Sequence, residues 1–191
     1  MRWLDHRDAV PDSLRGAIVA LGNFDGFHRG HQAVAGEAIK WAREEGRPSI
    51  VATFDPHPVR FFKPDAEPFR LTTLEQRQEL YLEAGATAML VLHFDGTLAS
   101  TTAEDFIGDL LAKHLGVSGV VTGEDFTFGK ARGGLFVAPQ FAKRRTKKVL
   151  DKSIARIAHG KSARSAHQCL ISFMLEQEYE LVNVSAGSLD A

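Results

Sequence analysis

Four short apolar runs, each rich in branched side chains, constrain the fold of this 191-residue chain most strongly. They are AIVAL, SIVATF, AMLVLHF and GVVTG, at residues 17–21, 49–54, 88–94 and 119–123. Short runs in which apolar residues do not alternate with polar ones are typical of strands buried on both faces of a parallel sheet. We therefore predict four strands that share one sheet.

Amphipathic helical patterns separate these four runs. The stretches 31–46, 73–85 and 101–116 repeat apolar residues at helical spacing, and the first of them ends at a glycine. Strands that alternate with helices favour an α/β fold, a doubly wound parallel sheet over residues 15–134. In such sheets ligands bind beyond the carboxyl ends of the strands, so the residues after each run are the candidates for function.

Composition excludes several classes of protein. No apolar run approaches the ~20 residues that a membrane span requires, and the N-terminal stretch MRWLDHRDAVPDSL lacks the apolar region of a secretory signal. A single cysteine, Cys169, excludes an internal disulfide framework and a multi-cysteine zinc site. We therefore expect a cytoplasmic protein with no membrane partner.

The stretch GNFDGFHRGH, residues 22–31, follows the first predicted strand and leads into the first predicted helix. Gly22 and Gly26 allow the backbone to turn tightly and to approach a ligand closely. Amides at a helix start attract phosphate, and the imidazoles of His28 and His31 can donate to phosphate oxygens. The turn therefore predicts a site for a nucleoside triphosphate. It is not a Walker loop, because no Gly-Lys-Ser/Thr follows.

Other interpretations of the two histidines stay open at this point. They can be helix caps or surface residues, and the His-x-Gly-His spacing can arise by chance. A zinc pair is a further alternative, although neither a third ligand nor the i, i+4 spacing of a helical zinc pair is present.

Further stretches give the turn a specific context. TFDPHPVRFF (53–62), LTTLEQR (71–77), FDGTLASTTAEDFI (94–107) and VVTGEDFTFGKARGG (120–134) follow it in order. The turn alone is similar to the signature of the HxGH nucleotidyltransferase superfamily. Together the stretches resemble the adenylyltransferase (FAD synthetase) module of bacterial bifunctional riboflavin kinase/FAD synthetase, over about residues 15–134.

The resemblance implies a Rossmann-like HxGH nucleotidyltransferase fold and an enzyme that uses ATP and FMN as substrates. The implied reaction transfers AMP from ATP to FMN, with Mg²⁺ accompanying ATP, and releases pyrophosphate. His28, His31 and Asp125 are the implied catalytic residues, and for Asp125 this role is favoured over that of a turn or N-cap acid. The nucleotide would contact the turn, through Gly22, Asn23, Phe24 and Gly26. No residue is expected to bind a resident metal.

The resemblance places the flavin beside the loop that follows the second strand. Pro56, His57 and Pro58 would border it, and Phe54, Phe62, Phe126 and Phe128 would supply apolar walls for the isoalloxazine ring. Each of these phenylalanines is also a plausible core residue. Lys130 and Arg132 would meet phosphate or belong to a solvated loop.

The pattern changes after Gly134. Between Lys143 and Arg164 the chain carries nine Lys and Arg residues and a single acid, Asp151. We therefore predict a nucleotidyltransferase core at 1–134 and an atypical basic segment at 135–191. The stretch from Phe141 to Gln177 fits a weakly amphipathic helix, and YELVNV (179–184) fits a final strand. The family's terminal Ser/Thr-rich motif and its riboflavin kinase domain are not expected here.

Three interpretations of this change remain. The chain is a truncated or frame-shifted product, or a divergent transferase with another phosphate grip, or a protein of this fold that binds nucleotide or flavin without catalysis. We expect an FMN adenylyltransferase of low activity, with the non-catalytic binding protein as the alternative. The basic run also admits nucleic acid as a partner, but a solvated helix is the commoner meaning. We expect a monomer.

Overall fold

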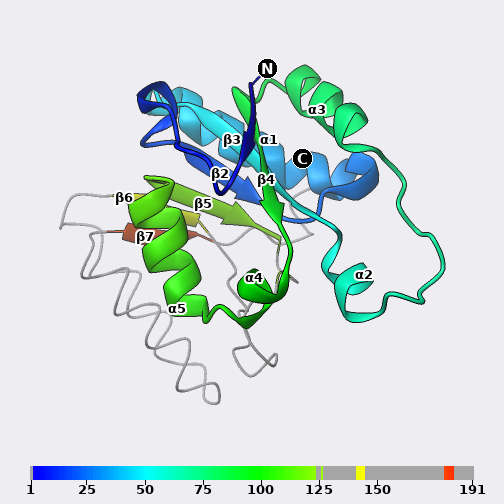
Figure 1. Cartoon of the computed structure of the whole chain (residues 1–191). Helices are drawn as coiled ribbons and strands as arrows, with labels where there is room; N and C mark the ends of the chain where they lie inside the picture. Colours follow the sequence, from blue (N-terminus) through cyan, green and yellow to red (C-terminus); the bar gives the residue numbers. More distant parts are fainter. Residues whose placement is uncertain (1, 124–125, 127–140, 145–178, 183–191) are drawn as a thin grey trace, which may run out of the picture.

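The structure is a computed structural model, and it describes residues 2–123, 126, 141–144 and 179–182. Five parallel strands form one sheet in the order β1-β4-β3-β2-β5 (Figure 1). Their bounds are β1 Arg2–Asp5, β2 Ile18–Leu21, β3 Ser49–Asp55, β4 Ala88–His93 and β5 Gly119–Thr122. The four predicted strands are confirmed. Strand β1 adds a fifth at the edge, next to β4.

The three predicted helices are also present. They are α1 Arg29–Glu44, α3 Leu74–Glu83, and α5 Ala103–Asp105 continued by the π-helix η3 Phe106–His114. The capping of α3 follows from its sequence, because Thr73 and Gln76 each accept a hydrogen bond from the other's backbone N–H. The shorter elements that the periodicity did not predict are α2 Pro58–Phe62, α4 Gly96–Ser100 and two 3₁₀ turns, η1 Asp12–Leu14 and η2 Asp25–Phe27.

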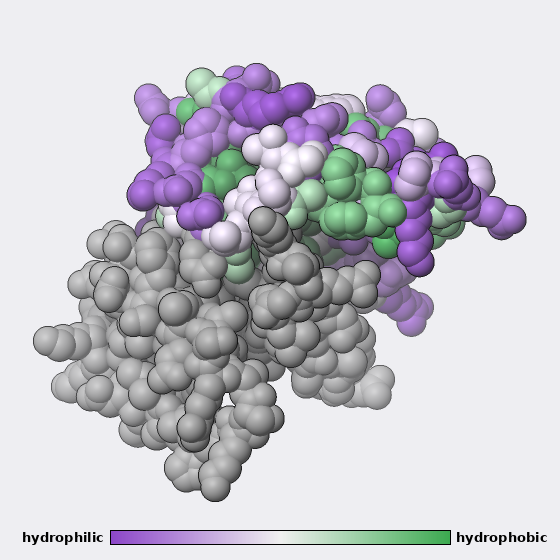
Figure 2. All heavy atoms as spheres, turned by 60° about the horizontal axis from the view of Figure 1, so that its bottom comes forward, coloured by the Kyte–Doolittle hydropathy of each residue, from purple (hydrophilic) through white to green (hydrophobic). Residues whose placement is uncertain are grey.

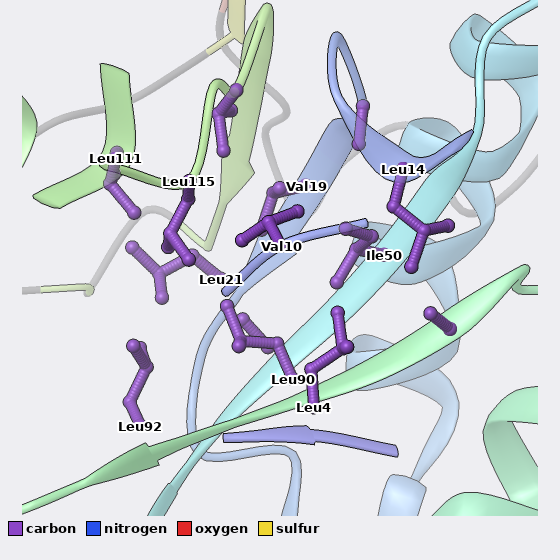
Figure 3. Close-up of a cluster of buried hydrophobic side chains, with 14 of the residues drawn as sticks. Leu4, Val10, Leu14, Val19, Leu21, Ile50, Leu90, Leu92, Leu111 and Leu115 are labelled. Atoms are coloured by element: carbon purple, nitrogen blue, oxygen red, sulfur yellow. The ribbon is translucent and has the colours of Figure 1, made fainter. Parts of the chain in front are cut away.

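Both faces of the sheet are covered, which explains why its strands are continuously apolar. In β2, Val19 and Leu21 join one buried cluster, whereas Ile18 and Ala20 join the other. Helices α1 and α3 pack on the Ile18 face, and η3 packs on the Val19 face, where Leu111 and Leu115 meet the strand side chains (Figure 3). This division is the doubly wound arrangement that the sequence predicts.

Strand β2 stands where the winding of the sheet reverses. Helix α1 leads from β2 to its neighbour β3 across one face, whereas α5 and η3 lead to its other neighbour, β5, across the opposite face. In open parallel sheets, ligands bind at the carboxyl ends of the strands beside such a reversal. The residues that follow β2, from Gly22 to His28, occupy this place.

A second, two-stranded sheet is formed by β6 Phe141–Arg144 and β7 Tyr179–Val182, which pair antiparallel. Strand β6 lies next to β5 (Figure 1). The predicted final strand is confirmed for its first four residues. The helix predicted from Phe141 is wrong for residues 141–144, because pairing with a distant segment supplies the backbone hydrogen bonds there, and local periodicity does not report such a partner. The other residues of the predicted basic segment lie outside the described residues.

Candidate nucleotide site

The carboxyl edge of the sheet brings together the loops in which the sequence predicts function. Because β2, β3 and β5 run parallel, the turn at 22–28, the loop at 55–58 and Gly123, which follows β5, all lie at this edge. Asp125, Phe128, Lys130 and Arg132 lie outside the described residues. Their predicted roles are therefore untested.

His28 begins helix α1 and holds the second histidine beside it. It is the N-cap residue, and its Nδ1 accepts a hydrogen bond of 3.4 Å from the backbone N–H of His31. The two imidazole rings stack with centroids 3.6 Å apart. Because Nδ1 accepts, the neutral ring of His28 carries its proton on Nε2. This exposed residue therefore presents an N–H donor beyond the helix start.

His31 is half-buried, and its ring meets the buried Phe24 ring edge-on at 5.3 Å. Burial and the neighbouring His28 lower the pKa of His31 to about 4, so the imidazole is neutral near pH 7. Among the described residues, neither His31 Nδ1 nor Asn23 Oδ1 has a hydrogen-bond partner, although both atoms are buried. Buried polar atoms are rarely left unpaired, so both mark a place where a bound molecule can supply a partner.

Three glycines, two in the turn and one at the start of α1, lie where an added Cβ would crowd a neighbouring side chain. A Cβ at Gly22 would lie 3.0 Å from the Phe24 ring, and a Cβ at Gly30 would lie 3.3 Å from the His28 ring. Gly26 has φ +71°, and a Cβ there would lie 2.8 Å from Leu71 Cδ1. The glycines therefore allow the rings and the 70–72 segment to close on the turn.

The turn carries backbone strain as well. Phe24 and Phe27 have φ values of 46° and 38°, in the left-handed region that side chains rarely adopt. Both rings are buried against Tyr81 of α3, with centroids 6.3 and 5.1 Å away. Core packing therefore offsets the strain. It also places Phe24, predicted to contact the nucleotide, with its side chain in the core.

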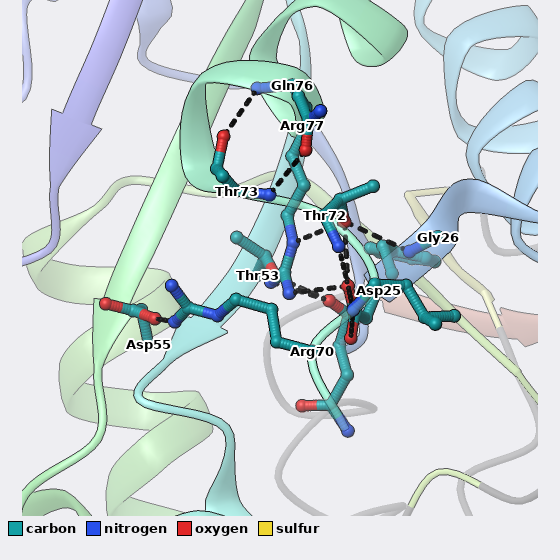
Figure 4. Close-up of polar contacts among 12 residues, drawn as sticks. Asp25, Gly26, Thr53, Asp55, Arg70, Thr72, Thr73, Gln76 and Arg77 are labelled. Atoms are coloured by element: carbon teal, nitrogen blue, oxygen red, sulfur yellow. Dashed lines mark hydrogen bonds and ion pairs between the residues drawn. The ribbon is translucent and has the colours of Figure 1, made fainter. Parts of the chain in front are cut away.

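Asp25 ties the turn to the segment before α3 (Figure 4). Its carboxylate accepts hydrogen bonds from the Leu71 N–H at 3.0 Å, the Thr72 N–H at 2.9 Å and the Thr72 hydroxyl at 2.7 Å. Although burial acts to raise the pKa of Asp25, the bonds from Leu71 and Thr72 and the charge of Arg77 lower it to about 2. The carboxylate is therefore ionised throughout the neutral range.

Arg77 completes this network from beneath the turn. Its guanidinium lies 3.0 Å from Asp25 Oδ1 and donates to the hydroxyls of Thr72 at 3.2 Å and Thr53 at 2.9 Å. It also donates to the Asn23 carbonyl at 3.3 Å, and the Thr53 hydroxyl donates to the same carbonyl at 2.6 Å. The side chain is 2% exposed. We call Asp25, Thr53, Thr72 and Arg77 the turn network.

LTTLEQR is one of the stretches in which the sequence resembles the family, but no role for Arg77 is predicted from it. A signal was available, because Arg77 falls three residues after Leu74 and four before Tyr81, on the apolar side of its helix. A cation on a buried helix face requires polar partners. The pattern therefore indicates a buried ion pair, although it does not identify Asp25 as the partner.

The loop after β3 is held by its own caps. His57 is the N-cap residue of α2, its Nδ1 accepts from the Val59 N–H at 3.1 Å, and burial lowers its pKa. Pro58 is the first residue of the helix, and Pro56 is half-buried before it. Asp55 pairs with Arg70, so the segment that binds Asp25 is also attached to this loop (Figure 4).

Aromatic side chains gather beside this loop. Among the described residues, the Phe94 ring has three aromatic neighbours, with centroids 5.9 Å away for Phe54, 5.4 Å for Phe61 and 5.8 Å for Phe62. Phe126 stacks on Phe54 at 6.3 Å. We call these five residues the aromatic group. Phe54 is buried in the core, whereas Phe62 is 65% exposed, and an apolar patch lies in the part of the surface that α2 occupies (Figure 2).

Comparison with known proteins shows which family this chain resembles. The family model for FAD synthetase matches residues 10–163, which extends beyond Gly134, so the position of the predicted domain boundary stays a prediction. A bifunctional riboflavin kinase/FMN adenylyltransferase of Escherichia coli K12 is 41% identical over 131 residues, which are 66% of this chain and 41% of that protein. A putative bifunctional riboflavin kinase/FMN adenylyltransferase of Geobacillus thermodenitrificans is 38% identical over 122 residues, which are 64% of this chain and 65% of that protein.

The crystal structure of a macrolide-efflux protein from Streptococcus pneumoniae is also similar. It aligns with a TM-score of 0.58 at 28% identity, and the match covers 69% of this chain and 44% of the other. This chain spans about two fifths of the length of the Escherichia coli relative. The family match over 10–163, together with the histidine turn at the reversal of the sheet, shows that the chain belongs to the FAD synthetase family.

Proposed function

We propose that this chain is an FMN adenylyltransferase, which transfers AMP from ATP to FMN and releases pyrophosphate. The observation that carries the proposal is the pair of stacked histidines at the start of α1, at the point where the sheet reverses. The family match and the names of the relatives support the same reaction. The substrates are then ATP and FMN.

The chemistry requires alignment and charge stabilisation more than a base. A phosphate oxygen of FMN attacks the α-phosphorus of ATP, the bond from that phosphorus to the bridging oxygen breaks, and pyrophosphate leaves. Because the attacking phosphate is already ionised at neutral pH, no side chain has to remove a proton. The protein contributes by holding the reactants in line and by donating hydrogen bonds to the oxygens that gain charge.

The turn after β2 supplies such donors. The first amides of a helix have no partner within it, and the helix dipole favours an anion there. His28 adds its Nε2–H beside them, and the buried Nδ1 of His31, which has no partner among the described residues, is a further donor when it carries the proton of the neutral ring. We assign His28 and His31 to the ATP phosphates, with Gly22, Gly26 and Asn23 forming the backbone cradle.

The flavin is assigned to the loop after β3. Pro56, His57 and Pro58 form its border, and the exposed Phe62 with the half-buried Phe126 offers an apolar wall to a flat ring. Asp125 and Phe128 belong to the same proposal by their positions in the sequence. A cytoplasmic location and a monomeric state are proposed with it.

Magnesium would accompany the ATP phosphates. In the part of the chain that the structure describes, no three His, Cys, Asp or Glu side chains group closely enough to hold a metal ion. We assign no protein ligand to the magnesium. Among the same residues, no helix has the length and apolarity of a membrane span.

Two ATP analogues test which bond the enzyme breaks. With FMN and Mg²⁺, β,γ-methylene-ATP should yield FAD, because its bond between the α-phosphorus and the bridging oxygen is intact and breakable. In α,β-methylene-ATP a carbon replaces that oxygen, so it should bind without yielding FAD. FAD is detected by chromatography. If both substrates bind but neither ATP nor the β,γ analogue gives FAD, the chain is a nucleotide- or flavin-binding protein of this fold instead.

A further inference from the structure

The Thr72 hydroxyl makes every hydrogen bond that a hydroxyl can make. The Thr72 hydroxyl donates to Asp25 and accepts from Arg77 Nε and from the Gly26 N–H at 3.1 Å. One donor and two acceptor sites are the full capacity of a hydroxyl. Three of the four network members therefore meet at one oxygen, which also holds the backbone of the turn.

The network also spans the elements that must act together. Asp25 lies in the turn and Thr53 on β3, whereas Thr72 lies just before α3 and Arg77 lies within it. Arg77 contacts all three of the others and also the Asn23 carbonyl, which precedes the strained Phe24. A lysine at this position would not make the same contacts, because the guanidinium directs several donors from one rigid plane, whereas the ammonium group of lysine is a compact charge.

From this geometry we infer that Arg77 is a positioning residue for adenylyl transfer: through Asp25, Thr72 and the Asn23 carbonyl it holds the nucleotide turn, and with it His28 and His31, in place for the ATP phosphates. This inference rests on the proposed function. Arg77 does not touch the reacting atoms in this arrangement. Its contribution lies in the rate of transfer, because small displacements of aligned groups slow a reaction strongly.

The chain contains a matched control at the opposite edge of the sheet. Arg47 precedes β3 and lies 2.9 Å from Glu45 Oε2, and it also donates to the Gly16 carbonyl at 3.2 Å and the Ser118 hydroxyl at 3.1 Å. It therefore joins the amino ends of β2, β3 and β5 much as Arg77 joins elements at their carboxyl ends. A substitution there removes an ion pair, a bond to a carbonyl and a bond to a hydroxyl without touching the turn, from a side chain that is 31% exposed against 2% for Arg77.

The test compares Arg77→Lys with Arg47→Lys in the whole chain. We expect Arg77→Lys to lower kcat for FAD formation at least tenfold while KM for FMN changes less than threefold, and Arg47→Lys to keep kcat within twofold. Equal losses in both variants would mean that Arg77 contributes only to general stability, and would overturn the inference. If the wild-type chain forms no FAD, the proposed function fails instead.

A second readout does not depend on activity. The Gly26 amide donates to Thr72, so its hydrogen exchange, followed in glycine-labelled protein, reports whether the turn is held. We expect at least tenfold faster exchange in Arg77→Lys and in Thr72→Val, and wild-type exchange in Arg47→Lys and Thr72→Ser, which keeps the hydroxyl. If Arg77→Lys does not fold, the comparison of Thr72→Val with Thr72→Ser still tests whether the network holds the turn. Unchanged Gly26 exchange in Thr72→Val would overturn the inference.

Discussion

Helix α1 contains two glycines, Gly30 and Gly36, at which the same substitution by alanine should have different consequences. A Cβ added at Gly36 meets no described atom within 4 Å, whereas one added at Gly30 lies 3.3 Å from both Cε1 and Nδ1 of the His28 ring. Glycine within a helix costs about 0.5–1 kcal/mol relative to alanine. Gly36→Ala should therefore raise the free energy of unfolding by about that amount and leave FAD formation unchanged.

Gly30→Ala should behave differently because the His28 ring must move by a few tenths of an ångström. This ring stacks on His31 at 3.6 Å and is exposed, so it can yield by turning away from the new methyl group. A misplacement of 1 Å can cost a rate factor of about 100, so we expect a fall of about five- to tenfold in kcat. Stability should change by less than about 1 kcal/mol, because the helical gain offsets the contact.

The comparison requires urea unfolding and steady-state kinetics on the two variants and the wild type. Urea midpoints give the change in stability, and chromatography of FAD gives kcat. Full wild-type kcat in Gly30→Ala would show that the spacing of the two histidines does not require a glycine between them, against this prediction. An equal loss of kcat in Gly36→Ala would also count against the prediction. It would show that kcat responds to any added side chain in the helix and not to displacement of the His28 ring.

Three further outcomes are expected. His31 should titrate near pH 4 by imidazole NMR, and ATP should raise its pKa because phosphate charge favours the imidazolium. The pKa of Asp25 is lowered from 3.8 to about 2, so the stability that its carboxylate contributes is complete above pH 4 and is lost as the pH falls through 2. In urea unfolding at a series of pH values, Asp25→Asn should show no such loss. Phe62→Ala should weaken FMN binding in fluorescence titration about five- to tenfold, yet keep stability within about 0.5 kcal/mol, because the ring is 65% exposed.

The sheet could be predicted because its strands are buried on both faces. Ile18 packs in the core on one face of the sheet and Val19 in the core on the other face. Successive residues are therefore apolar, and the strand appears in the sequence as a continuous apolar run. Strand β1 has the sequence RWLD, and only Leu4 of its four residues is buried. Such a short edge strand has no period to detect. Its place depends on pairing with β4, which is distant in the sequence.

The candidate site could be predicted in part. The glycines and histidines of the turn can be recognised because the predicted strand, turn and helix follow one another directly, within residues 17–46. The turn network cannot be, because its members come from the turn, from β3 and from α3, and only the fold brings Asp25, Thr53 and Arg77 together. Phe24 is predicted to contact the nucleotide because of its place in the turn, but its position in the sequence does not show that its ring is buried in the core.

The proposed reaction is tested most simply by the rate of FAD formation by the wild-type chain and by His28→Ala, measured in one assay with FMN, ATP and Mg²⁺. We predict FAD and pyrophosphate in equal amounts from the wild type. We also predict a loss of about 10²–10³ in kcat for His28→Ala, the cost of removing one donor from a charge-stabilising site. FAD formation by His28→Ala at the wild-type rate would contradict the assignment of the turn, and no FAD from the wild type would contradict the proposed function.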